Sequence, residues 1–181
     1  MTQYARPDGD LSLGGLWEDA GAGRSNIYQS IDESSANDSD YIANSADGMT
    51  TPDWAKFSLG DINDPESGSN HKIIYRAVGT WMMTEPSLIV SLYQSTTQIA
   101  TATNSSLNNQ ASFGSFATYT ITLTSSEANN ISDYDALAIW FKRSPTGDMA
   151  DDVKISQAYF ECPDAAAAAA ATSPAFLLFM E

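Results

Sequence analysis

The fold of this chain is constrained most strongly by short segments in which apolar and polar residues alternate with a period of two. The clearest lies within residues 116–124, where threonine occupies every second position from Thr118 onward. Successive side chains of a β-strand point to opposite faces, so the residues between the threonines share the other face. The pattern predicts a half-buried strand with one solvated face.

Similar patterns recur along the chain, separated by clusters of Gly, Asn, Ser, Pro and Asp. Strands are predicted at residues 72–83, 88–94, 98–103, 116–124, 136–143 and 153–161. Helical periodicity is limited to a late run of alanines and one turn at 125–131, capped by Ser125 or Ser126. We therefore predict an all-β fold, an antiparallel β-sandwich of jelly-roll type with an N-terminal arm and an extended C-terminal tail.

The length of 181 residues suits one domain with a real core. Residues 1–50 carry widely spaced apolar anchors among Gly, Asp, Ser and Asn, which predicts an arm whose short strands lie over the sandwich. Residues 51–163 are predicted to form the sandwich core. Residues 164–181 are predicted to form an Ala-rich, apolar C-terminal arm.

The C-terminal arm contains seven consecutive alanines, then Thr172, Ser173 and Pro174, and then an apolar run. A helix this short is marginal in water, and proline prevents its continuation, so the segment requires a partner surface. We expect assembly contacts from the apolar run and, second, from the N-terminal arm. The residues are Phe176, Leu177, Leu178, Phe179 and Met180, with Leu11, Leu16 and Trp17.

The charge balance, 23 acidic against 8 basic residues, gives a net charge of −15. This opposes nucleic-acid binding, which depends on Lys and Arg neutralising phosphates. The C-terminal apolar stretch falls short of the roughly 20 residues of a membrane span, and the N-terminus lacks a secretory pattern. We expect a soluble protein made in a cytoplasm, with neither nucleic acid nor membrane as a partner.

Catalytic constellations are weak in this sequence. His71 is the single histidine and has no nucleophile motif to accompany it, and Cys162, the single cysteine, has no basic neighbours. Acidic pairs are numerous, but most are explained by turns and solvation. One loop concentrates oxygen donors that suit Ca²⁺, although it lacks the EF-hand spacing. Its candidate ligands are Asp61, Asn63, Asp64 and Glu66, and no other cofactor is expected.

Tryptophans could stack on sugars if they were exposed on a sheet face. The candidates are Trp54, Trp81 and Trp140. Each is flanked by apolar residues typical of strands, so packing in the core or between subunits is the favoured interpretation.

Two groups of segments resemble a known family. The first comprises residues 6–10, 15–17, 27–28, 31–33 and 38–42, and the second residues 119–124, 133–137 and 153–161. Together they resemble small structural proteins of tailed bacteriophage virions, whose expected fold is a jelly roll. The resemblance implies a location in the virion, with the major capsid protein or other virion subunits as partners, and a homo-oligomer. It carries over no functional residues.

The leading hypothesis is therefore a non-enzymatic capsid decoration or cement protein that binds the shell exterior and bridges neighbouring subunits. The alternative is a carbohydrate-binding β-sandwich module of a phage tail fibre or adhesin. A hydrolase has the least support.

Overall fold

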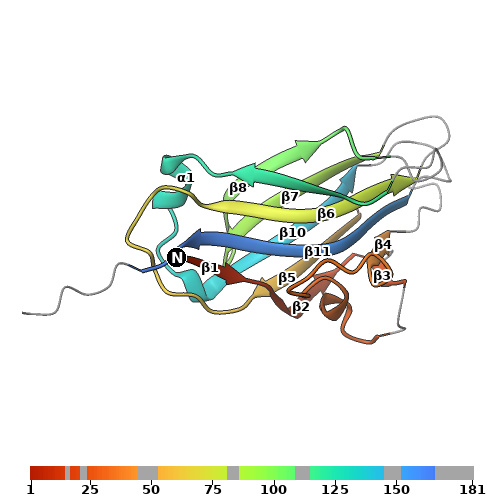
Figure 1. The fold of residues 1–181 in the computed structure, drawn as a ribbon, viewed down its shortest axis with the longest axis horizontal. Helices are drawn as coiled ribbons and strands as arrows, with labels where there is room; N and C mark the ends of the chain where they lie inside the picture. The colour runs from red at the N-terminus through yellow and green to blue at the C-terminus, as the bar shows by residue number, and fades with distance from the viewer. Residues whose placement is uncertain are drawn as a thin grey trace, which may run out of the picture.

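Two β-sheets stacked face to face form the body of the protein in a computed structural model (Figure 1). The structure describes residues 1–14, 17–20, 24–44, 53–80, 86–108, 115–144 and 152–165. In the view of Figure 1, the sheet that contains β6 and β11 lies in front, and we call it sheet A. The sheet behind it, which contains β5, β7, β8 and β10, is sheet B.

Sheet A is antiparallel and is organised around the long strand β11. Its strands are β1 (Thr2–Ala5), β3 (Trp17–Asp19), β4 (Ile42–Asn44), β6 (Lys72–Thr80), β9 (Ala117–Thr122) and β11 (Asp152–Pro163). The spatial order is β3-β4-β11-β6-β9. β1 also pairs with β11, beyond the end of β4, through the register Ala5 to Phe160.

Sheet B is antiparallel as well. Its strands are β2 (Pro7–Leu13), β5 (Asp53–Leu59), β7 (Ser87–Gln94), β8 (Thr97–Asn104) and β10 (Leu137–Ser144). The order is β2-β5-β10-β7-β8. β10 is the central strand and pairs with both β5 and β7 along most of its length.

The strand order confirms the predicted antiparallel sandwich. Strands β4 to β11 fill the orders β4-β11-β6-β9 and β5-β10-β7-β8, so the last strands return to lie beside the first ones. This is the eight-strand, two-sheet arrangement of a jelly roll. The predicted N-terminal arm differs from expectation, because β1, β2 and β3 join the sheets by strand pairing and do not lie over them. Pairing satisfies backbone groups that would otherwise stay open at the sheet edges.

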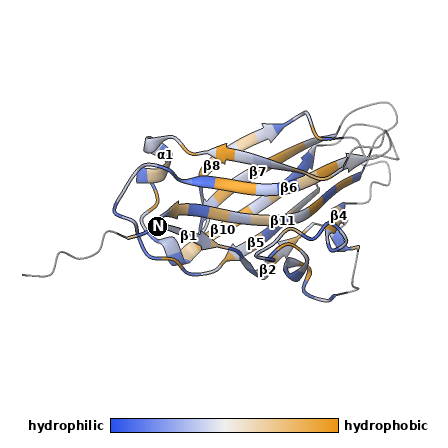
Figure 2. Ribbon diagram, in the orientation of Figure 1, coloured by the Kyte–Doolittle hydropathy of each residue, from blue (hydrophilic) through white to orange (hydrophobic). Residues whose placement is uncertain are grey.

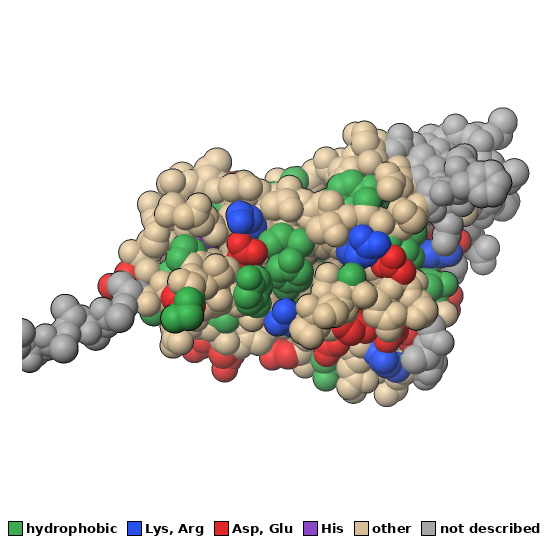
Figure 3. All heavy atoms as spheres, viewed as in Figure 1, with side chains coloured by type: hydrophobic (Ala, Val, Ile, Leu, Met, Phe, Trp, Pro, Cys, Tyr) green, Lys and Arg blue, Asp and Glu red, His purple; other side chains and the backbone are tan. Residues whose placement is uncertain are grey.

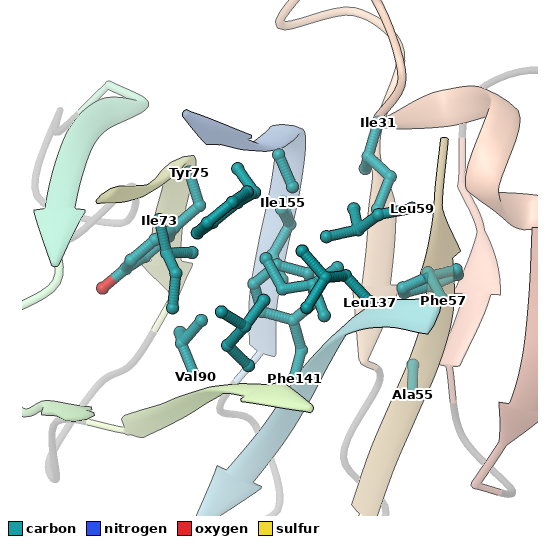
Figure 4. Close-up of a cluster of buried hydrophobic side chains, with 14 of the residues drawn as sticks. Ile31, Ala55, Phe57, Leu59, Ile73, Tyr75, Val90, Leu137, Phe141 and Ile155 are labelled. Carbon is teal, nitrogen blue, oxygen red and sulfur yellow. The ribbon is translucent and has the colours of Figure 1, made fainter. Parts of the chain in front are cut away.

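The hydrophobic core fills the space between the two sheets (Figure 4). Hydrophobic colour is concentrated along the strands in Figure 2. Phe57 and Phe141 from sheet B contact each other at a ring distance of 6.3 Å, and Tyr75 from sheet A meets Phe141 at 6.2 Å. Burying each such side chain contributes about 1.5–3 kcal/mol. The core therefore binds the two sheets together.

Helical structure is confined to single turns within the described ranges: η1 (Ile27–Ser30), α1 (Ser125–Asn129) and η3 (Tyr134–Ala136). The turn predicted at 125–131 is confirmed, but its N-cap is Thr124 and not a serine. Glu127 accepts a hydrogen bond from the Thr124 backbone N at 2.7 Å, which completes a capping box that Ser125 could not form with it. No helix among the described residues is long and apolar enough to span a membrane.

Strand β11 contains a β-bulge that reverses its pattern of side chains. The register shifts between Ile155 and Gln157. Before the shift Val153 and Ile155 belong to the core, whereas after it Ala158, Phe160 and Cys162 do. Strict alternation over 153–161 would place Val153 and Tyr159 on one face, but the extra residue at the bulge exchanges the two faces.

Candidate functional site

The outer face of sheet B carries aromatic side chains. Trp140 on β10 lies between the fully buried Ile139 and Phe141, so strand alternation directs its ring away from the core. Trp54 on β5 precedes the buried Ala55 and faces the same way. Both rings are half-buried on the outer face, so core packing is wrong for Trp54 and Trp140, whereas packing between subunits stays a prediction.

Strand register brings three rings into contact. The Trp54 and Trp140 centroids lie 5.6 Å apart with an interplanar angle of 82°. Tyr93 on β7 approaches Trp140 to 4.8 Å at 51°. We call these three residues the aromatic platform. Hollows of about 320 Å³ and 380 Å³ are each lined by all three of its rings.

Polar groups surround the aromatic platform. The Tyr93 hydroxyl donates a hydrogen bond to Gln98 Oε1 at 3.0 Å. This hydrogen bond holds the Gln98 side chain and thereby sets the direction of its amide nitrogen. Ser91 and Thr101 form a hydroxyl pair at 2.8 Å in the wall of the smaller hollow. Burial raises the pKa of Tyr93, so its hydroxyl stays protonated at neutral pH and remains a donor. Aromatic surface with a few fixed polar groups is typical of small-molecule and sugar sites.

Two lysines lie on the same face. Cross-strand pairing places Lys56 opposite Trp140 and Lys142 opposite Trp54. The Lys56 ammonium donates to the Ser95 carbonyl at 3.0 Å and lies 5.2 Å from the centre of the Tyr93 ring. Lys142 lines the smaller hollow. Rings and ammonium groups therefore alternate across β5 and β10.

His71 and Cys162 occupy buried positions away from the aromatic platform. His71 Nε2 lies 2.8 Å from the Tyr134 hydroxyl and Nδ1 lies 3.0 Å from the Ser69 carbonyl, so both ring nitrogens are engaged. Burial lowers the pKa of His71 and raises the pKa of the Cys162 thiol to about 11. A neutral buried imidazole and a protonated thiol suit packing roles, and neither meets a nucleophile–base pair among these contacts.

Two carboxylates of the segment that follows η1, Glu33 and Asp40, come together. Glu33 and Asp40 share a side-chain hydrogen bond, and Asp40 also pairs with Arg24 at 2.7 Å. Burial, followed by the negative charge of Asp40, raises the pKa of Glu33 to about 7. Asp40 is only 7% exposed and is held by Arg24, whereas Glu33 is half-buried, so Asp40 is closed to a polymeric substrate.

The predicted calcium ligands Asp61, Asn63, Asp64 and Glu66 lie in the loop between β5 and β6. Asp64 Oδ1 accepts a hydrogen bond from the Glu66 backbone N at 2.7 Å, and Asn63 exchanges hydrogen bonds of 2.9 Å with Gln3 on β1. Over the described ranges, no group of three or more His, Cys, Asp or Glu side chains could hold a metal ion. Calcium binding by this loop stays a prediction.

The predicted assembly contacts divide into three cases. Leu11 on β2 is 54% exposed and is accessible to a partner. Trp17 on β3 is 5% exposed and packs in the core of its own chain. Leu16, Phe176, Leu177, Leu178, Phe179 and Met180 lie outside the described residues, as does Trp81. The assembly role of these residues stays a prediction.

Sequence reasoning missed Tyr93, Lys56 and Lys142. The signal was nevertheless present around Trp140, because alternation in β10 separates Trp140 and Lys142 from the buried Ile139 and Phe141. Apolar neighbours in sequence are therefore a poor guide to burial in a strand, where the relevant neighbours are two residues away. Tyr93 becomes recognisable only when the pairing of β7 with β10 is known.

Comparisons with known proteins identify the fold of this chain, but they identify no family. The sequence matches no protein-family model and no curated protein. An arabinose-bound MgGH51 α-L-arabinofuranosidase is similar in structure with a TM-score of 0.50 at 9% identity, over 86% of this chain and 25% of that chain. At that identity the likeness shows a shared fold, and this chain spans about a quarter of the enzyme.

Two further solved structures are similar over most of this chain. The C-terminal CBM6 of LamC, a marine laminarinase from Zobellia galactanivorans, has a TM-score of 0.47 at 12% identity, over 89% of this chain and 98% of that chain. The enzymatically active domain of tailspike protein 4 from bacteriophage CBA120 has a TM-score of 0.48 at 12% identity, over 88% and 19%.

Proposed function

We propose that this protein is a non-enzymatic β-sandwich that binds glycan chains through the aromatic platform. The observation that supports this proposal is the contact of Trp54, Trp140 and Tyr93 on the solvent side of sheet B. Large apolar side chains gathered on an outer face mark an interaction site. Sugar rings present apolar C–H faces to aromatic rings, and their hydroxyls match donors such as the Gln98 amide.

The form of the site suits an extended ligand. The two hollows share the three rings of the aromatic platform, so a chain lying along the face contacts aromatic surface on both sides of Trp140. The site is open to solvent along one sheet and contains none of the paired carboxylates that glycoside hydrolysis requires, as far as its described lining shows. This lining supports the proposal of binding without cleavage.

Binding to a glycan array, followed by calorimetric titration with the best ligand, tests the proposal on the full chain. Truncating a central aromatic of a binding surface costs about 2 kcal/mol or more, which is about thirtyfold in affinity. Trp140→Ala and Trp54→Ala should each weaken binding by at least this factor while leaving the circular dichroism spectrum unchanged.

Tyr4→Ala is the matched control. Tyr4 is also exposed, at 48%, and its ring also contacts another aromatic ring, Tyr159 at 5.8 Å, but on sheet A. The control variant should retain wild-type affinity. Absence of glycan binding by the folded wild-type protein, or equal binding by the tryptophan variants, would overturn the proposal.

The hypothesis of capsid decoration depends on the C-terminal apolar run, which lies outside the described residues, and it stays a prediction. A glycan-binding face is compatible with the alternative location on a tail fibre or adhesin. Attachment to a virion and binding to a glycan use different parts of this chain, so the two can be tested separately.

A further inference from the structure

The basic residues on the two outer faces of the sandwich differ in whether they form ion pairs. On sheet A, Lys72 pairs with Glu161 at 2.8 Å and Arg76 pairs with Asp38 at 2.6 Å. Figure 3 shows this side of the molecule, where blue and red side chains lie next to each other around a hydrophobic patch. The positive charges of Lys72 and Arg76 are therefore neutralised within the protein.

On sheet B the lysines beside the aromatic platform lack such neutralisation. Lys56 contacts a neutral carbonyl and the ring of Tyr93, and neither contact removes its charge. Lys142 forms no hydrogen bond or ion pair with any described residue. Asp8 on β2 accepts a hydrogen bond from the Ser58 hydroxyl and forms no ion pair with either lysine.

This is an unusual position for uncompensated positive charge in a chain with a net charge of −15. Acidic side chains outnumber basic ones almost threefold, so carboxylate partners are abundant over the surface as a whole. Exposed charges more than about 8–10 Å apart are largely screened at physiological salt. The two nearby lysines therefore contribute most of the electrostatic potential at a bound ligand. Among the described residues that line the aromatic platform, the charged ones are Lys56 and Lys142, so the sign of charge there is opposite to that of the protein.

The spacing of the two lysines matches a repeating ligand. Lys56 lies opposite Trp140, and Lys142 lies two residues further along β10, so the lysines are diagonal cross-strand neighbours. Diagonal neighbours of this kind are about 7–8 Å apart. The two lysines line different hollows of the aromatic platform, Lys142 the smaller one and Lys56 the larger one. Each ammonium can therefore meet a separate anionic group of a chain whose sugars stack on the rings between them.

We propose that the ligand class of the aromatic platform is an acidic glycan, whose carboxylate or sulfate groups are bound by Lys56 and Lys142. This inference rests on the proposed glycan-binding function and specifies its ligand. Charge-assisted hydrogen bonds from the lysines supply preference for acidic sugars, and stacking on Trp54 and Trp140 supplies binding that any sugar chain shares.

The test compares three oligosaccharides of matched length by calorimetric titration: an oligogalacturonate, a sulfated oligosaccharide and a neutral xylo-oligosaccharide. The wild-type protein should prefer at least one acidic ligand by about tenfold over the neutral one. Raising NaCl from 50 to 500 mM should reduce that preference. Lys142→Gln and Lys56→Gln should each lower acidic binding severalfold and leave neutral binding unchanged.

Lys72→Gln is the control, because it removes a lysine that is paired with Glu161 on sheet A. It should preserve the preference for acidic ligands. Stronger binding of the neutral ligand, or an acidic preference that survives in both sheet B lysine variants, overturns the acidic-glycan inference and leaves the proposed function standing. Failure of all three ligands and of the array to bind removes the proposed function itself.

Discussion

Replacing Glu33 by glutamine should stabilise the fold in neutral and alkaline solution and leave it unchanged in acid. Burial and the charge of Asp40 raise the pKa of Glu33 from 4.5 to about 7, so the folded protein binds this proton more tightly than the unfolded chain does. The contribution of the protonated Glu33 carboxyl to the free energy of unfolding is fully present below pH 4.5. It decreases as the pH rises towards 7 and is absent above pH 7. Glutamine resembles the protonated side chain and keeps a donor for Asp40.

The size of the effect follows from the pKa difference. At 1.36 kcal/mol per pKa unit, the upper limit is about 3 kcal/mol. Because Glu33 is only half-buried, solvent screening reduces this to about 1–2 kcal/mol. The backbone around residue 33 should be unaffected, since Gln157 and Arg6 donate to its carbonyl oxygen and not to the side chain.

Urea unfolding of both proteins at pH 4.5 and pH 8 measures the effect. Glu33→Gln should exceed the wild type by about 1–2 kcal/mol at pH 8 and equal it at pH 4.5. Glu66→Gln, which changes an exposed loop carboxylate, serves as the control and should show no such pH dependence. Equal stability of the wild type and Glu33→Gln at pH 8, or a difference independent of pH, would refute the assignment of a proton to Glu33.

Further predictions concern the cap of α1 and the loop between β5 and β6. Thr124→Ala removes the acceptor of the Glu127 backbone N–H, and should lower the free energy of unfolding by about 0.5–2 kcal/mol in urea titrations, whereas Thr124→Ser should restore most of it. An unchanged midpoint for Thr124→Ala contradicts the capping role. If the loop of Asp61 and Asp64 binds calcium, 1 mM CaCl₂ should raise the melting temperature of the wild type and not of Asp61→Asn/Asp64→Asn. Identical melting curves of the wild type in CaCl₂ and in EDTA would contradict the calcium hypothesis.

The register of β5, β10 and β7 shows why the candidate site could be predicted only in part. Trp54 and Trp140 were identifiable as sugar-stacking candidates, but they are 86 residues apart in sequence and meet because β5 pairs with β10. Tyr93 and the two lysines have no motif around them. Their common location results from pairing, which depends on contacts made along whole strands.

Strand content and fold class were determined by the sequence itself. Period-two alternation, β-branched residues and turn clusters are local signals, and they located β6 to β11 to within a few residues wherever the structure describes them. The charge of −15 likewise follows from composition alone. Tertiary structure decided what local signals cannot encode: the bulge that exchanges the faces of β11, the proximity of Glu33 and Asp40, and the contact of Tyr93 with Trp140. Each depends on which strand or loop lies opposite, and that choice is made by burial of the whole core.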